Sequence, residues 1–216
     1  MYSRIIRSLI SLLLGLTLPA LGEAAPLTFK LLPTYSRATF KSDAPLETIV
    51  GTTAGPAVEG RLMVDPADPT TTRGTIRVDL SALRSGVEKR DADMRGKDYL
   101  DVEGGEQNRY AVFTLTGVTL PGPLAPGQER EGTAKGTLTI KGRPVETEAA
   151  VRVTYLTLTP AQVEQQKRFG FTTDNLKVRA KFATTFTNHG MQIPQLLFLK
   201  VANDLQLEAD LTFVRE

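Results

Sequence analysis

The chain has 216 residues, 41% of them hydrophobic, with 26 basic and 24 acidic side chains and a formal net charge of +2. A single histidine and the lack of cysteine exclude disulfides and a zinc site of the usual His/Cys type. Without the two arginines of the N-terminal segment the charges balance at 24 against 24, so there is no electrostatic case for nucleic-acid binding.

The first 24 residues have the pattern of a secretory signal peptide. Arg4 and Arg7 precede a short apolar run at 9–21, and small residues including Gly22 and Ala24 follow it. The run is shorter than the roughly 20 residues of a membrane-spanning helix, so an uncleaved anchor is the less favoured alternative. We expect a signal peptide at 1–24, cleaved after Gly22 or Ala24, and one mature domain at 25–216 that is periplasmic or secreted.

Period-two alternation and turn residues predict about eight or nine strands in the mature chain. The last two runs alternate strictly: Leu176, Val178, Ala180 and Phe182 share one face of the first, and basic residues occupy the other. The predicted strands are 27–32 with 36–42 as one strand interrupted at Pro33, then 46–53, 58–65, 72–83, 110–120, 132–141, 145–156, 175–187 and 202–215.

Two segments lack this alternation and are predicted to be helical. Residues 85–101 are highly charged and indicate a short helix or helical loop. Residues 160–169 are rich in helix formers, with Thr159 as N-cap and Pro160 at the first helical position.

Long antiparallel strands that are apolar on one face predict an all-β fold, either a sandwich or an up-and-down barrel. Strands of this length favour a barrel, and eight tilted strands enclose an interior that is filled by side chains or holds one slender ligand. The pattern alone favours a core packed with side chains over an interior that holds a ligand. The same apolar residues would line either one.

Three stretches resemble a known family. They are 75–113, which begins TIRVDLSALRSGVEKRDADMRGKDYLDV, the hairpin LTIKGRPV at 138–145, and 186–213, which begins FTNHGMQIPQLLFLKVANDLQL. Their order and spacing resemble the YceI-like family of bacterial lipocalin-like, polyisoprenoid-binding proteins. The resemblance implies an extended eight-stranded antiparallel lipocalin-like barrel with one or two short helical segments. Asn188-His189 and the long loop at 121–131 depart from the family pattern.

The resemblance also implies a binding protein rather than an enzyme, with the apolar tail of its ligand inside the barrel. The residues expected to line such a tunnel, or else to pack a filled core, are Ile76, Val78, Phe113, Leu115, Leu138, Ile140, Val151, Val153, Phe182, Phe186, Leu197 and Phe198. Arg90 and Arg95 are weaker candidates for a head-group contact, since a guanidinium suits carbonyl or phosphate oxygens. The alternative for Arg90 and Asp91 is a salt-bridged cap on the barrel.

The remaining polar residues offer no metal or catalytic site. The acidic residues of 91–101 lack the spacing of a calcium loop. His189 has no nucleophile or carboxylate partner at motif spacing, so we expect an ordinary loop histidine whose replacement by alanine hardly changes ligand retention.

The sequence therefore favours an exported carrier of a polyisoprenoid, an isoprenoid quinone or a fatty-acyl compound, acting in transport, storage or sensing. We expect this carrier to need no cofactor beyond that lipid, and to have as partners the lipid and, transiently, a membrane. A filled-core barrel that acts through its loops is the alternative, and an enzyme on a lipid substrate is the least favoured reading.

Overall fold

The computed structural model describes residues 26–196 and 199–216. Ten strands form one antiparallel sheet in the order β1-β4-β5-β6-β7-β8-β9-β12-β2-β3. The strands are β1 (Leu27–Leu31), β2 (Arg37–Ala44), β3 (Glu47–Ala54), β4 (Val58–Val64), β5 (Arg73–Asp79), β6 (Tyr110–Thr119), β7 (Glu129–Ile140), β8 (Arg143–Thr157), β9 (Asp174–Thr185) and β12 (Asp204–Arg215). A separate pair consists of β10 (Gln195–Leu196) and β11 (Leu199–Lys200).

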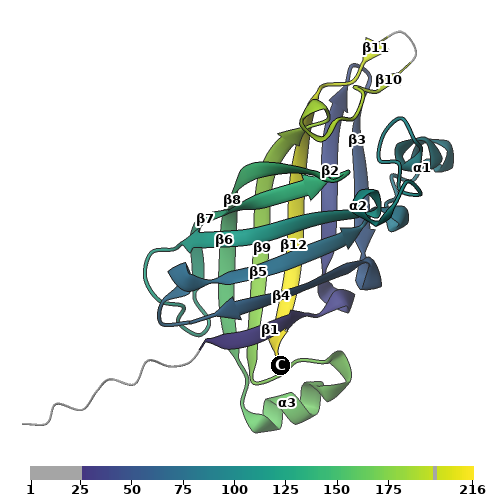
Figure 1. Cartoon of the computed structure of the whole chain (residues 1–216). Coiled ribbons are helices and arrows are strands. Elements are labelled where there is room, and N and C mark those ends of the chain that lie inside the picture. The colour runs from purple at the N-terminus through teal and green to yellow at the C-terminus, as the bar shows by residue number, and fades with distance from the viewer. Residues whose placement is uncertain (1–25, 197–198) are drawn as a thin grey trace, which may run out of the picture.

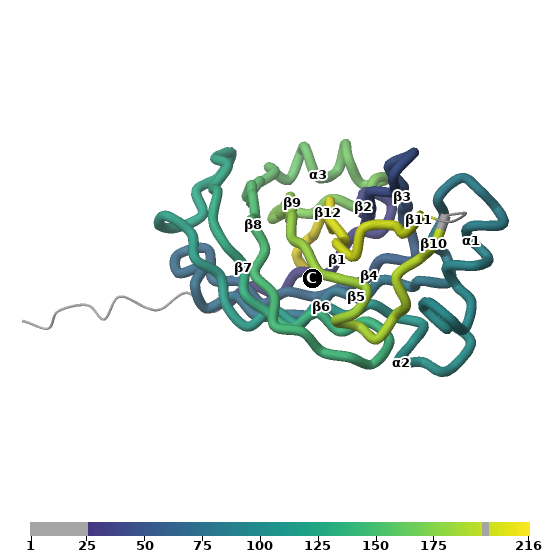
Figure 2. Tube along the Cα trace, turned by 90° about the horizontal axis from the view of Figure 1, so that it is seen from above, coloured from purple at the N-terminus to yellow at the C-terminus, as the bar shows by residue number. Residues whose placement is uncertain are grey.

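An additional pairing of β1 with β12 closes the sheet into an eight-stranded barrel, as the sequence predicted. In Figure 2, which is seen from above, β4, β5 and β6 run along one side and β9, β12 and β2 along the other, with β7 and β8 joining the two sides. The β2–β3 hairpin continues the sheet beyond the closure. It rises with β10 and β11 at the upper end in Figure 1.

The predicted interrupted strand consists of two strands that share one edge of β12. β1 pairs with residues 213–215 of β12, and β2 pairs with residues 206–210. Between them Pro33 begins a short 3-10 turn, Pro33–Tyr35, because proline has no N–H to give to a ladder. The turn separates the strand that closes the barrel on β4 from the strand that starts the hairpin.

The helical segments follow the sequence prediction in most respects. α1 (Glu88–Arg95) lies in the charged segment, and α3 (Pro160–Gln166) begins with a capping box between Thr159 and Gln162. In Figure 1 α3 lies at the end of the barrel opposite α1. The short α2 (Glu106–Arg109) was not predicted, since four residues carry no helical periodicity.

Two predicted strands are shorter than expected because short turns end them. The strand predicted at 72–83 stops at Asp79, whose carboxylate accepts a hydrogen bond from the backbone N–H of Ser81 at 2.9 Å and begins the 3-10 turn Leu80–Ala82. The strand predicted at 175–187 stops at Thr185, before the 3-10 turn Thr187–His189. Both turns lie at the α1 end of the barrel.

Candidate ligand-binding cavity

The barrel encloses a cavity of about 630 Å³ lined mostly by apolar side chains. This volume falls within the range of about 300–1,000 Å³ that is usual for small-molecule sites. Two clusters of buried side chains lie along it. One surrounds the fully buried Phe29 and Phe213, and the other surrounds Leu83 and Met191.

Inward-facing side chains near the middle of the barrel are only partly buried. Ile76, Val78, Phe113 and Phe182 all line the cavity and are packed against the core clusters, yet each keeps some accessible surface. In a filled core these positions would be fully buried. Their accessible surface is therefore the wall of the cavity.

Strand register places bulky side chains together at one level of the cavity, which we call the aromatic row. Phe40 on β2 is opposite Leu207 on β12, and Leu207 is opposite Phe182 on β9. The Phe182 and Phe113 rings have centroids 5.8 Å apart. Phe40 is also opposite Gly51 on β3, and its ring occupies the space where a side chain at position 51 would be.

The next inward-facing level carries small side chains, and we call it the alanine row. Thr53, Ala38, Ala209, Ala180 and Val151 are opposite one another on five adjacent strands, and all line the cavity. Because these side chains are short, they leave room inside the barrel where the aromatic row reduces it. The cavity is therefore wider at the alanine row than at the aromatic row.

All of the residues predicted to line a tunnel that lie in the described part of the chain do line this cavity. They are Ile76, Val78, Phe113, Leu115, Leu138, Ile140, Val151, Val153, Phe182 and Phe186. Leu197 and Phe198 lie outside the described residues.

The two arginines considered for a head-group contact are placed differently. Arg90 lines the cavity, and its guanidinium contacts Glu47 of β3 at 2.8 Å and Ser85 Oγ at 2.9 Å. This ion pair ties α1 to the β2–β3 hairpin. Arg95 does not line the cavity. Its Nη1 donates a hydrogen bond to the backbone carbonyl oxygen of Leu83 at 3.1 Å.

Asp91 holds the first turn of α1 against the segment that precedes the helix. Its buried carboxylate accepts hydrogen bonds from the Ser85 backbone N–H at 2.7 Å and from Ser85 Oγ at 2.6 Å. Burial by itself raises the pKa of Asp91, but these hydrogen bonds and the nearby arginines hold it below its ordinary value. Asp91 therefore has a structural part in holding α1.

The charged side chains that line the cavity form ion pairs. Besides the pair of Arg90 with Glu47, Lys89 contacts Asp93 at 3.1 Å, and Glu208 contacts Lys41 at 3.3 Å. Across residues 26–196 and 199–216, no group of three or more His, Cys, Asp or Glu side chains is arranged to hold a metal ion.

The YceI-like domain matches residues 29–213 of the chain. This chain belongs to the YceI-like family. The match spans the barrel from β1 to β12, so the whole cavity is part of the family domain. No curated protein matches the chain in sequence.

Solved structures have the same fold as this YceI-like protein. BcnA from Burkholderia cenocepacia is 17% identical with a TM-score of 0.59, and the match covers 82% of this chain and 95% of BcnA. A polyisoprenoid binding domain from Saccharophagus degradans, implicated in plant cell wall breakdown, is 15% identical with a TM-score of 0.64 and coverages of 88% and 99%. A YceI protein from Campylobacter jejuni is 13% identical with a TM-score of 0.50 and coverages of 74% and 82%.

His189 of this YceI-like protein is not the ordinary loop residue that we expected. It is fully buried, its Nδ1 lies 3.2 Å from the carbonyl oxygen of Arg143, and its Nε2 lies 2.9 Å from Thr184 Oγ1. Because a carbonyl only accepts, Nδ1 carries the proton and Nε2 accepts from the threonine hydroxyl. Burial lowers the pKa of His189, so the imidazole is neutral and fixes the loop that carries Phe186.

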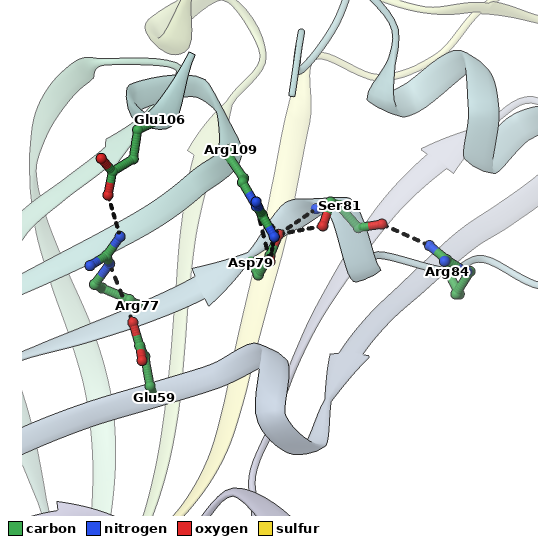
Figure 3. A network of polar contacts seen from close by, with 7 residues as sticks. All are labelled: Glu59, Arg77, Asp79, Ser81, Arg84, Glu106 and Arg109. Atoms are coloured by element: carbon green, nitrogen blue, oxygen red, sulfur yellow. Dashed lines mark hydrogen bonds and ion pairs between the residues drawn. The ribbon is translucent and has the colours of Figure 1, made fainter. Parts of the chain in front are cut away.

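A polar network supports the rim of the barrel where β5 ends (Figure 3). Arg109 Nη2 contacts Asp79 Oδ2 at 2.7 Å, and this hydrogen bond is the main reason that the pKa of Asp79 lies below its ordinary value. Beside it, Arg77 contacts Glu106 at 3.1 Å. These contacts join β5 to α2, which precedes β6.

The same network reaches the hairpin through Arg84. Its Nη1 donates to the carbonyl of Ser81 at 3.0 Å, and its backbone forms a bridge with Thr52 of β3. Leu80 and Leu83 lie in this segment and line the cavity. The network therefore holds the apolar rim against the β2–β3 hairpin.

Sequence reasoning missed the lining residues of that hairpin. Ala38, Phe40 and Ser42 alternate with Thr39 and Lys41, but the run is short and follows an interruption. The alternation was a sufficient signal for an inward face. The width at the alanine row had no such signal, because it depends on register between strands that are distant in the sequence.

None of the helices within the described ranges 26–196 and 199–216 has the length and apolarity needed to cross a membrane.

Proposed function

We propose that this YceI-like protein is an exported binding protein that holds a long apolar ligand inside its barrel. The ligand is a polyisoprenoid, an isoprenoid quinone or a fatty-acyl compound, and the role is transport, storage or sensing rather than catalysis. The observation that carries the proposal is the apolar cavity of about 630 Å³. The polyisoprenoid binding domain from Saccharophagus degradans, which shares the fold, supports this ligand class.

Burial of the tail supplies enough free energy for tight binding. An isoprene unit has five carbons, so its complete burial is worth about 4 kcal/mol at roughly 0.8 kcal/mol per carbon. Ordering costs reduce this, and at about 0.3 kcal/mol per atom an eight-unit chain would gain about 12 kcal/mol. Apolar contact alone discriminates weakly between tails of similar length, so polar contacts would set the selectivity.

The cavity also weighs against the filled-core alternative, in which the barrel acts only through its loops. A barrel that served only as a scaffold would be stabilised by filling this space, since empty apolar volume costs stability. The protein instead keeps partly accessible Phe and Ile side chains on the inner face.

The test is mass spectrometry of the organic extract of the protein purified from its native host. A stoichiometric isoprenoid or acyl species would support the proposal and name the ligand. The opposite result is no species above background together with a folded protein that fails to take up decylubiquinone. The intact mass of the same sample tests export, because a cleaved chain begins at residue 23 or 25.

A further inference from the structure

Among the described residues, the cavity opens at one end of the barrel only. Five of its lining residues are exposed, and all of them lie at the α1 end: Glu47, Val87, Lys89, Asp93 and Gln195. They belong to the start of β3, to α1 with the residue before it, and to β10, which lie together in Figure 1. We call this end the mouth, because a ligand enters the cavity here.

The loop between β6 and β7 crosses the opposite end of the barrel. Neighbouring strands are antiparallel, so this loop and the β4–β5 loop share the end away from α1. The Leu124 N–H donates to the carbonyl oxygen of Pro66 in the β4–β5 loop, and the Gly127 N–H donates to that of Tyr155 on β8, both at 2.8 Å. β4 and β8 are four strands apart in the eight-stranded barrel, so these two bonds hold the loop on opposite sides of it.

Leu124 closes the cavity at this end. It is 6% exposed, lines the cavity, and belongs to the same cluster of buried side chains as Phe213. The lining residues of the β4–β5 loop, Pro69 and Thr72, are buried as well. We call Leu124, Pro69 and Thr72 the floor of the cavity. Leu124 is supplied by the loop at 121–131, whose length departs from the family pattern.

A cavity with one mouth and a floor encloses a limited length of chain. An engineered apolar cavity of about 150 Å³ in another protein holds benzene, with six carbons, so each carbon needs about 25 Å³. At that ratio the cavity of about 630 Å³ encloses about 25 carbons, or about five isoprene units. A chain of eight units exceeds this capacity.

We propose that the barrel limits the length of apolar chain that it encloses to about 25 carbons, that Leu124 sets this limit, and that a longer chain leaves its remainder outside the mouth. This rests on the proposed function and narrows the fully enclosed ligands to isoprenoids of four or five units and acyl chains of similar size. Each enclosed unit contributes to affinity, and units beyond the mouth gain nothing from the cavity.

The test lets the delipidated wild type and a variant compete for a limiting amount of one isoprenoid alcohol. The two proteins carry different affinity tags, so they are separated afterwards and the alcohol on each is measured by mass spectrometry. Because both proteins share the same free ligand, its solubility in water cancels from the ratio. The alcohols are farnesol, geranylgeraniol, hexaprenol and solanesol, which have three, four, six and nine isoprene units.

Leu124→Ala removes three side-chain carbons from the floor and deepens the cavity. Farnesol and geranylgeraniol fit within either protein and should divide evenly. Hexaprenol and solanesol should favour Leu124→Ala by about fivefold, since three more of their carbons are enclosed. Leu31→Ala is the matched control, because Leu31 is 5% exposed in the same cluster and does not line the cavity. All four alcohols should divide evenly between this variant and the wild type.

The proposal is overturned if hexaprenol and solanesol also divide evenly between wild type and Leu124→Ala, or if farnesol favours the variant as strongly as solanesol does. A preference confined to solanesol would overturn the capacity of about 25 carbons. If Leu124→Ala does not fold, Leu124→Phe replaces it and should lose the two long alcohols to the wild type by about fivefold. Failure of the proposed function is distinguishable, because then neither protein carries any of the four alcohols.

Discussion

Replacing Ala180 by phenylalanine tests whether the space at the alanine row is empty in the ligand-free protein. Ala180 belongs to this row and lines the cavity, with Ala209 and Val151 opposite it on the neighbouring strands. The phenylalanine ring enters the wide part of the cavity, where a ligand tail would otherwise lie. We expect Ala180→Phe to fold, to be more stable without ligand, and to bind long apolar ligands less tightly.

The magnitudes follow from the burial of the ring and from the tail that it displaces. Burying a phenylalanine side chain is worth about 1.5 kcal/mol or more, which corresponds to an increase of about 3–6 °C in Tm for a domain of this size. If the ring displaces one isoprene unit, the ligand loses five carbons at about 0.3 kcal/mol each, or about 1.5 kcal/mol. Affinity should then fall by about tenfold.

The assay is thermal unfolding of delipidated protein combined with displacement of N-phenyl-1-naphthylamine by decylubiquinone. Lys181→Phe is the matched control, because Lys181 is the next residue on the same strand and its side chain is 71% exposed. Lys181→Phe should change neither Tm nor the affinity for decylubiquinone appreciably. The reasoning is refuted if Ala180→Phe lowers Tm by several degrees while Lys181→Phe does not, since overpacking of a filled core has that effect.

Three other replacements test the surroundings of the cavity. The pKa of His189 is lowered by burial, so the free energy of unfolding should fall as the pH drops below 6.5, where the unfolded chain binds a proton and the native chain does not. Urea unfolding on either side of that pH should show that the free energy of unfolding depends less on pH in His189→Gln than in the wild type. An unchanged pH dependence would contradict the burial argument. Asp79→Asn should cost about 1 kcal/mol at neutral pH, and because the native pKa of Asp79 lies below 3.8, the difference from wild type should shrink as the pH falls through it. A constant difference in acid would show that the Arg109 contact contributes nothing. Gly51→Ala should push the Phe40 ring from its place over β3 into the cavity and weaken decylubiquinone binding; unchanged affinity would show that this ring does not limit the cavity.

The elements with strict alternation could be predicted from the sequence because each strand carries its own pattern. β9 and β12 lie within about two residues of their predicted ends, and Phe182 is on the inner face as expected. The N-cap at Thr159 was a local signal of the same kind. Asp79 shows the limit. Its carboxylate accepts hydrogen bonds from the backbone N–H and the hydroxyl of Ser81, and the strand ends there, four residues before the predicted end at Leu83.

The cavity itself could not be predicted, because alternation identifies an inner face and does not say what fills it. Ala38, Ala180 and Ala209 look like any small core residues until register places them opposite one another. The burial of His189 is also a tertiary property, since its partners Thr184 and Arg143 come from two strands.

The closure of the barrel also determines how the chain must fold. Residues 29–31 of β1 pair with residues 213–215 of β12, about 180 positions away. Contacts between such distant segments are slow to form, because loop-closure entropy is lost before they contribute. Until β12 is in place, β1 and β9 both present unpaired edges that are open to other chains. Substitutions that weaken this three-residue pairing should therefore appear as slow folding and aggregation, including those at residues 214 and 215, which do not line the cavity.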